Sequence, residues 1–187
     1  MEPDNAAARR RFEELFDAHY AELTRFATRR MGADAAGDIV AGTFLIAWRR
    51  LAELPADHAR AWLYAAARRV IANETRARNR RDRLSAKATA EATGIVEDHA
   101  VQVDERLRVR ALLVTLSPAD QEVLRLIEWE GLEVAEAALV LRCSQTALKV
   151  RLHRARKRFA QRLQAAERGH TAPVRPHSLV PGRSPSS

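Results

Sequence analysis

Two stretches of the chain gather arginine and lysine side chains that could bind an anionic partner. The first stretch contains Arg68, Arg69, Arg76, Arg78, Arg80, Arg81 and Arg83, and the second contains Lys149, Arg151, Arg154, Arg156, Lys157, Arg158 and Arg162. Guanidinium groups present several donors in a planar fork that matches phosphate oxygens. One basic run could simply be a solvated helix end that complements the helix dipole. Two such runs in separate helical segments favour nucleic-acid binding.

The overall composition agrees with an anionic partner and excludes several other classes of protein. The 187 residues contain Lys+Arg 32 against Asp+Glu 24, which gives a formal net charge of +8. Cys143 is the only cysteine, so an internal disulfide framework is excluded. No apolar run approaches the roughly 20 residues of a membrane span, and the first residues have no apolar signal-peptide core. We therefore expect no membrane insertion and a cytoplasmic location.

The histidines are too scattered to suggest a metal centre or a catalytic site. They are His19, His58, His99, His153, His170 and His177. No pair of them combines with acids at a metal-ligand spacing on one helix face. His153 lies among cations, which favours contact with DNA or phosphate over proton transfer. We expect no catalytic residue, no metal and no cofactor, and a metal-dependent hydrolase or nuclease is the least favoured class.

Helices must position the basic residues, because Ala, Leu, Arg and Glu dominate residues 10–165. Apolar residues at spacings of three and four predict helices over 5–31, 35–51 and 59–81. Their apolar stripes can bury one another, so we predict a small all-α domain over residues 5–83. Within it, Trp62 lies on the stripe and is expected in the core. Tyr64 lies off the stripe and is the better candidate for stacking on a base.

A second helical domain is predicted over residues 104–167. Ser117 and Pro118 form a strong helix start, because serine can cap a helix and proline suits its first turn. Between the domains, residues 84–103 are rich in Ala, Thr and acids, and we expect a flexible linker there. Residues 168–187 are rich in proline and serine, and we expect a disordered tail. The predicted fold class is all-α, with two small helical domains joined by a flexible linker.

Residues 134–159 have the pattern of a helix-turn-helix motif. A short helix over 134–141 precedes the three-residue turn Arg142-Cys143-Ser144. A longer basic helix then runs from residue 145 to about residue 166. Cys143 is most simply a small buried residue of the turn.

The second helix of this motif divides into an apolar face and a polar face. The apolar side chains, which should pack on the domain, are Leu148, Leu152, Ala155 and Phe159. The opposite face presents the residues expected to contact DNA, namely Gln145, Thr146, Lys149, Val150, His153, Arg154 and Lys157. A recognition helix needs this division, because its front must offer donors and cations to the major groove. An ordinary amphipathic helix would show the same division, but the short helix and turn before it favour the DNA-binding motif.

Taken together, the two helical units resemble those of bacterial sigma factors of the extracytoplasmic-function group. The residues that carry the resemblance in the first unit are FEELFDAHYAELTRFATRRMG, DIVAGTFLIAWRRL and ARAWLYAAARRVIANETRARNRR. In the second unit they are LSPADQEVLRLIEWEGLEVAEAALVLRCSQTALKVRLHRARKRF, in which Leu148 to Arg156 corresponds to the family's closing signature. Other helix-turn-helix regulators share only the second unit.

The resemblance implies partners and assigns roles to particular residues. Members of the family bind core RNA polymerase through the β′ clamp helices and the β flap, and they recognise the −10 and −35 elements of promoter DNA. Many are held inactive by an anti-sigma factor. The −35 contacts correspond to the polar face described above. The −10 contacts correspond to Arg60, Arg68, Arg69, Asn73, Arg76 and Arg78, and a base pocket to the loop 53–60. The polymerase-binding positions correspond to Asp38, Ile39, Thr43 and Arg49.

This sequence departs from the family's usual pattern at a few positions. Ala41 and Gly42 stand where acid and amide side chains are usual. They keep open a second interpretation, a helix-turn-helix DNA-binding regulator or a degenerate sigma-like protein that does not recruit polymerase. Arg142 replaces the usual glycine of the turn and must adopt a less favoured backbone conformation or shift the turn. Val150 replaces a common serine, which exchanges a hydrogen bond for an apolar contact such as one with a thymine methyl group.

Overall fold

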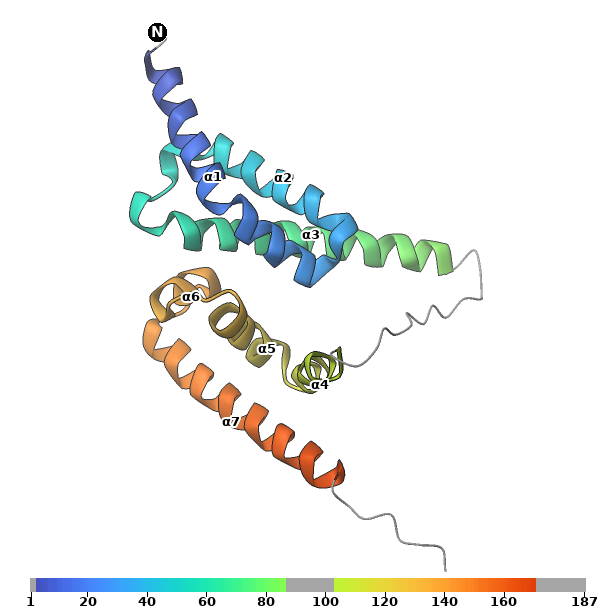
Figure 1. Cartoon of the computed structure of the whole chain (residues 1–187). Coiled ribbons are helices and arrows are strands. Elements are labelled where there is room, and N and C mark those ends of the chain that lie inside the picture. Colours follow the sequence, from blue (N-terminus) through green and yellow to red (C-terminus); the bar gives the residue numbers. More distant parts are fainter. Residues whose placement is uncertain (1–2, 87–102, 171–187) are drawn as a thin grey trace, which may run out of the picture.

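The computed structural model describes residues 3–86 and 103–170, which form helices joined by turns (Figure 1). Those two ranges contain no strand, so the predicted all-α fold is confirmed. None of the described helices is long and apolar enough to cross a membrane. The predicted linker, residues 84–103, and the predicted tail, residues 168–187, lie largely outside the described residues.

Three long helices form an N-terminal unit. They are α1 (Pro3–Met31), α2 (Ala33–Arg49) and α3 (Ala59–Ala86). Gly32 has a positive φ of 85° and separates α1 from α2, as its conformational freedom allows. Two short 3-10 turns, η1 (Leu51–Glu53) and η2 (Ala56–His58), connect α2 to α3. Helix α3 extends five residues past its predicted end at 81, because neither glycine nor proline interrupts it there.

The apolar stripes of α1, α2 and α3 meet in a common core, as their periodicity predicts. Leu23, Phe26 and Leu63 are almost fully buried in it. The expectation for Tyr64 is wrong: its side chain is only 1% exposed and its ring packs edge-on against Phe26, with the ring centroids 4.8 Å apart. Burial raises the pKa of Tyr64 to about 12. Trp62 is only half-buried. Because both α1 and α2 contact α3, its buried arc is wider than a single stripe and includes Tyr64.

Shorter helices and one long helix form a C-terminal unit. They are α4 (Val103–Val114), α5 (Pro118–Leu124), the π-helical turn η3 (Arg125–Trp129), α6 (Val134–Leu141) and α7 (Gln145–His170). The predicted cap of α5 is confirmed, since the Ser117 Oγ accepts a hydrogen bond from the Asp120 backbone N at 3.2 Å. Leu126, Ala137 and Leu148 are buried where these elements meet.

The two units lie side by side, with α6 next to α3 (Figure 1). The contact brings the end of α6 and the turn after it close to the surface of α3 that carries the first arginine-rich stretch. The start of the first arginine-rich stretch therefore lies near the helix-turn-helix, although the two are far apart in the sequence.

Candidate nucleic-acid interface

The helix-turn-helix motif has the boundaries that the sequence predicts. Helix α6 ends at Leu141, and α7 begins at Gln145. Arg142 has φ 53° and ψ 48°, so it adopts the left-handed conformation that glycine usually provides at this position. The Cys143 backbone N donates to the Ala138 carbonyl at 3.0 Å, which satisfies one of the last carbonyls of α6. The turn therefore has its predicted three residues, and Arg142 adopts the less favoured left-handed conformation.

Ser144 fixes the start of the second helix of the motif. Its Oγ accepts a hydrogen bond from the Ala147 backbone N at 3.1 Å, which is the geometry of an N-cap. The turn was predicted without this cap, although a serine directly before a helix could have indicated it. At the start of α6, Glu133 and Glu136 form a capping box.

Helix α7 has the predicted apolar and polar faces. Leu148, Leu152 and Ala155 are buried against the C-terminal unit, and Phe159 is partly buried. The predicted −35 residues are all exposed: Gln145, Thr146, Lys149, Val150, His153, Arg154 and Lys157. These residues form one exposed face of α7. The contact of this face with promoter DNA stays a prediction.

The basic side chains of α7 fall into two groups. Arg156 pairs with Glu128 at 2.7 Å and Arg158 with Asp120 at 2.5 Å, so these arginines also stabilise the unit itself. Within the described residues, Lys149, Arg154 and Lys157 form no ion pair. These three cations lie on the predicted DNA-facing side, where they could bind phosphate or base edges.

The predicted −10 residues on the later part of α3 are exposed. They are Arg69, Asn73, Arg76 and Arg78. Arg76 donates to the Asn73 Oδ1 at 2.6 Å, and Arg78 pairs with Glu74 at 3.2 Å. Two arginines predicted to act with them, Arg60 and Arg68, are instead partly buried and bonded to the C-terminal unit.

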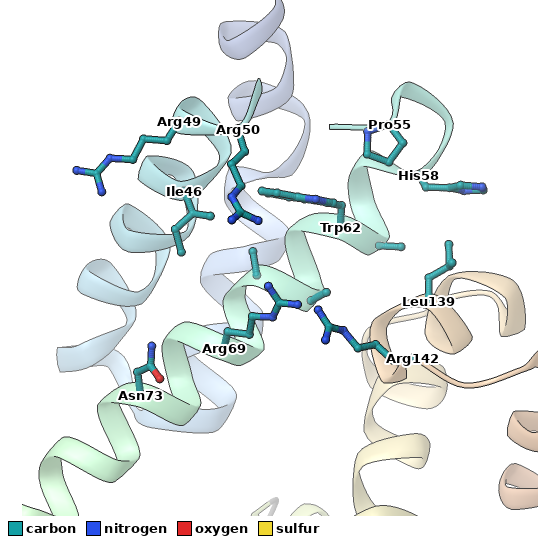
Figure 2. A pocket seen from close by; sticks show the side chains of 13 residues that line it. Ile46, Arg49, Arg50, Pro55, His58, Trp62, Arg69, Asn73, Leu139 and Arg142 are labelled. Carbon is teal, nitrogen blue, oxygen red and sulfur yellow. The ribbon is translucent and has the colours of Figure 1, made fainter. Parts of the chain in front are cut away.

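A cationic cavity of about 670 Å³ lies between α2, α3 and the end of α6 (Figure 2). Its basic lining residues are Arg49, Arg50, His58, Arg69 and Arg142, and no carboxylate of the described residues lines it. Arg69 and Arg142 extend toward each other across it from α3 and from the turn of the helix-turn-helix (Figure 2). Trp62 also lines this cavity, so Trp62, rather than Tyr64, is the aromatic ring of α3 that a base could reach.

The polymerase-binding residues predicted on α2 divide between its surface and its core. Asp38 and Arg49 are exposed. Ile39 and Thr43 are 2% and 0% exposed, so the prediction that their side chains face a partner is corrected: they pack inside the N-terminal unit. The Thr43 Oγ1 donates to the Ile39 carbonyl at 2.7 Å. Both positions fit the apolar periodicity of α2, so the correspondence with the family, and not the helix pattern, placed them at the partner surface.

The exposed part of α2 instead includes two large apolar side chains. Leu45 and Trp48 are 49% and 40% exposed. Trp48 packs edge-on against Phe12, with the ring centroids 5.1 Å apart. An apolar surface between Asp38 and Arg49 suits a protein partner better than a nucleic acid. Sequence reasoning missed Leu45, and Trp48, which the apolar periodicity predicts to be buried, is exposed instead. Ala41, Leu45 and Trp48 follow the exposed side of the helix at spacings of four and three.

Gly42, which departs from the family's pattern, faces α3. A Cβ atom at this position would lie 3.4 Å from the Val70 Cγ1, an ordinary contact distance. Ala41 is exposed. Gly42 is half-buried, so Ala41 is the more exposed of the two positions.

A hydrogen-bonded group joins α1 to the start of α3. Glu22 pairs with Arg60 at 3.1 Å and with His19 at 2.6 Å. Burial alone would raise the pKa of Glu22, but the hydrogen bonds from His19 and Arg60 outweigh it and hold that pKa below its ordinary value. Across residues 3–86 and 103–170, no three His, Cys, Asp or Glu side chains gather in a way that could hold a metal ion.

Known proteins match both units of the chain. Residues 15–81 match the family described as Sigma-70 region 2, and residues 106–159 match Sigma-70, region 4. The chain is 32% identical over 164 residues to the ECF RNA polymerase sigma factor SigL of Mycobacterium tuberculosis, and the match covers 84% of this chain and 90% of SigL.

Solved structures share the fold. The structure of CnrH in complex with the cytosolic domain of CnrY matches with a TM-score of 0.61 and 25% identity, covering 86% of this chain and 94% of CnrH. The sigma factor RpoE of Bartonella quintana, in complex with the anti-sigma factor NepR, matches with a TM-score of 0.61 and 24% identity, covering 82% of this chain and 96% of RpoE. With both sigma regions present in order and 32% identity to SigL along most of both chains, the chain belongs to the sigma-70 family of RNA polymerase sigma factors, in its ECF group.

Proposed function

We propose that this sigma factor binds core RNA polymerase in the cytoplasm and directs it to promoters with a −10 and a −35 element. The observation that carries the proposal is the presence, in one chain, of a helix-turn-helix with an exposed basic face and a separate helical unit with a second basic face. Two DNA-binding faces can hold one promoter at two places. In this role the chain performs no catalysis, since the polymerase carries the active site.

The exposed polar face of α7 is the proposed −35 reader. Lys149 and Arg154 form no ion pair with any described residue, and Val150 is 45% exposed between them along the helix. Guanidinium groups bind guanine edges or phosphates, whereas a valine side chain can contact a thymine methyl. Gln145, Thr146, His153 and Lys157 extend the same surface.

The α2 and α3 side of the cationic cavity and the exposed end of α3 are the proposed −10 surface. Opening a duplex costs stacking energy, and an aromatic ring beside cations can stabilise an unpaired base and its phosphate. Trp62 supplies the ring, Arg69 and Asn73 supply polar groups of the same cavity, and Arg76 lies further along α3.

The exposed surface of α2, from Asp38 through Leu45 and Trp48 to Arg49, is the proposed docking surface for the β′ clamp helices, and the C-terminal unit is proposed to contact the β flap. An anti-sigma factor is a further proposed partner, because RpoE, which has the same fold, was solved with the anti-sigma factor NepR.

Retention of core RNA polymerase on the immobilised protein tests the proposal. The wild-type chain should retain the polymerase at moderate salt, and Leu45→Asp should abolish retention because a charge replaces an exposed apolar contact. Ala18→Asp on the exposed side of α1 is the matched control and should retain the polymerase normally. If the wild-type chain binds promoter DNA but no polymerase, the DNA-binding regulator is the correct interpretation.

A further inference from the structure

Acidic side chains of the C-terminal unit face arginines of the N-terminal unit across their contact. We call Glu122, Glu130 and Glu136 the acidic face. Glu130 accepts hydrogen bonds from both Arg29 and Arg30, and its Oε1 lies 2.9 Å from the Arg30 Nη1. The side chains of Glu130 and Arg30 are only 1% and 8% exposed, so the contact excludes water from this pair.

The other two acids of this face bind arginines of α3. Glu122 lies 2.7 Å from the Arg68 Nε and 3.2 Å from the Arg30 Nη2. Glu136 lies 3.0 Å from the Arg60 Nη1. Single exposed ion pairs contribute little, but these pairs share partners and form a network. A network of this kind fixes the relative orientation of the two units.

Backbone carbonyls of the C-terminal unit complete the contact. Arg60 donates to the Glu130 carbonyl at 2.8 Å and to the Gly131 carbonyl at 3.3 Å. Arg68 donates to the Val140 carbonyl at 3.1 Å, near the end of α6. The last carbonyls of a helix lack partners within it and carry partial negative charge. The arginines of α3 therefore satisfy groups that would otherwise need water.

These bonds leave Arg60 and Arg68 poorly available to any other anion. The Arg60 Nε binds Glu22, and both of its Nη atoms bind acceptors of the C-terminal unit. The carboxylates occupy the donors that a phosphate group would need. Arg69 and Arg76, which contact no residue of the acidic face, stay exposed on the same helix.

We propose that the acidic face is an intramolecular docking surface that holds the two units closed and competes with promoter DNA for Arg60 and Arg68. The competition part rests on the proposed function, because it takes these two arginines as −10 contacts. Opening the contact frees them and separates α3 from the helix-turn-helix. The exposed Arg69 and Arg76 can meet DNA first, before the contact opens.

The distance between the units in solution tests the closed state. In a Cys143→Ser background, nitroxide labels at Ala18→Cys and Gln161→Cys, both exposed, report that distance by double electron–electron resonance. The chain with the intact acidic face should give one narrow distribution. Glu122→Gln together with Glu136→Gln should broaden it and move it to longer distances.

Glu13→Gln together with Glu14→Gln is the matched control. Both residues are exposed on α1 and form no ion pair within the described residues. Replacing them changes the net charge by the same amount as the Glu122/Glu136 variant. The control should keep the narrow distribution. Glu130→Gln is made separately because Glu130 is buried, and circular dichroism checks that each variant keeps its helix content.

Affinity for DNA tests the competition. In fluorescence anisotropy with a fluorescein-labelled single-stranded oligonucleotide of mixed sequence, the Glu122/Glu136 variant should bind at least about threefold more tightly than the control variant. An unchanged distance distribution overturns the closed state. A longer distance without tighter DNA binding overturns the competition. Polymerase retention is measured separately, so a failure of the proposed function leaves the distance result interpretable.

Discussion

Arg154 and Arg156 lie two positions apart on α7 but have different surroundings. The Arg156 Nη2 lies 2.7 Å from the Glu128 Oε1, whereas Arg154 forms no ion pair within the described residues and is exposed on the polar face. A helix turns about 100° per residue, so two positions are enough to move a side chain from one face toward another. The same type of residue therefore supports the unit at one position and is free to bind a partner at the other.

This difference predicts unequal effects of alanine on −35 binding. Arg154→Ala should weaken binding to a cognate −35 duplex by about 1–3 kcal/mol, because it removes a guanidinium group from the reading face. Arg156→Ala removes the same charge and should weaken binding much less. Anisotropy titrations with a duplex recovered from polymerase-bound DNA measure both. Equal losses in the two variants would contradict the assigned reading face.

A second pair of arginines tests the −10 surface. Within the described residues, Arg76 hydrogen-bonds to Asn73 and forms no ion pair, whereas Arg81 pairs with Glu74 at 2.7 Å. Arg76→Ala should reduce promoter opening by the assembled holoenzyme, because the exposed guanidinium group no longer holds the strand phosphate. Permanganate reactivity of unpaired thymines measures the opening. Arg81→Ala is the control on the same helix, and a larger defect there than in Arg76→Ala would place the contact elsewhere.

The strained turn of the helix-turn-helix predicts a stabilising substitution. Arg142 holds φ 53°, a conformation that costs a residue with a Cβ atom about 1 kcal/mol. Arg142→Gly should remove this cost and raise the Tm of the C-terminal unit by about 4–8 °C. Arg142→Ala loses the same charge but keeps a Cβ atom, so it should not show the increase. Thermal unfolding followed by circular dichroism separates the two, and equal Tm values would mean that the turn is not strained.

The lowered pKa of Glu22 predicts how acid affects the N-terminal unit. Because the folded pKa is below the ordinary value of 4.5, the ionised Glu22 contributes stability that is present above that value and is lost as the pH falls through the folded pKa. Glu22→Gln should therefore lower the urea midpoint at pH 7 and make its decrease toward about pH 4 shallower than in the wild-type chain. Glu14→Gln, an exposed change on the same helix, should keep the wild-type decrease. A parallel decrease in Glu22→Gln would contradict the role of this group.

The sequence by itself determined the helices and the two faces of α7. Apolar residues at spacings of three and four fix a helix and its buried side, because a single element buries its stripe whatever its neighbours are. The bounds of α6, the start of α7 and the cap at Ser117 followed from local signals of the same kind. The sequence also predicted the strain at Arg142, because this position of the turn usually holds a glycine in the left-handed conformation and the sequence has an arginine there.

Only the tertiary structure decided which side chains of α2 and α3 reach the surface. Helix α3 contacts α1, α2 and α6, so Tyr64 is buried off its stripe while Trp62 lines a cavity. Nor could the sequence show that Glu130 meets Arg30, one hundred positions apart. Charges on exposed helix faces follow no periodic rule that identifies their partners, and a pairing between units exists only once both have folded and their surfaces come together.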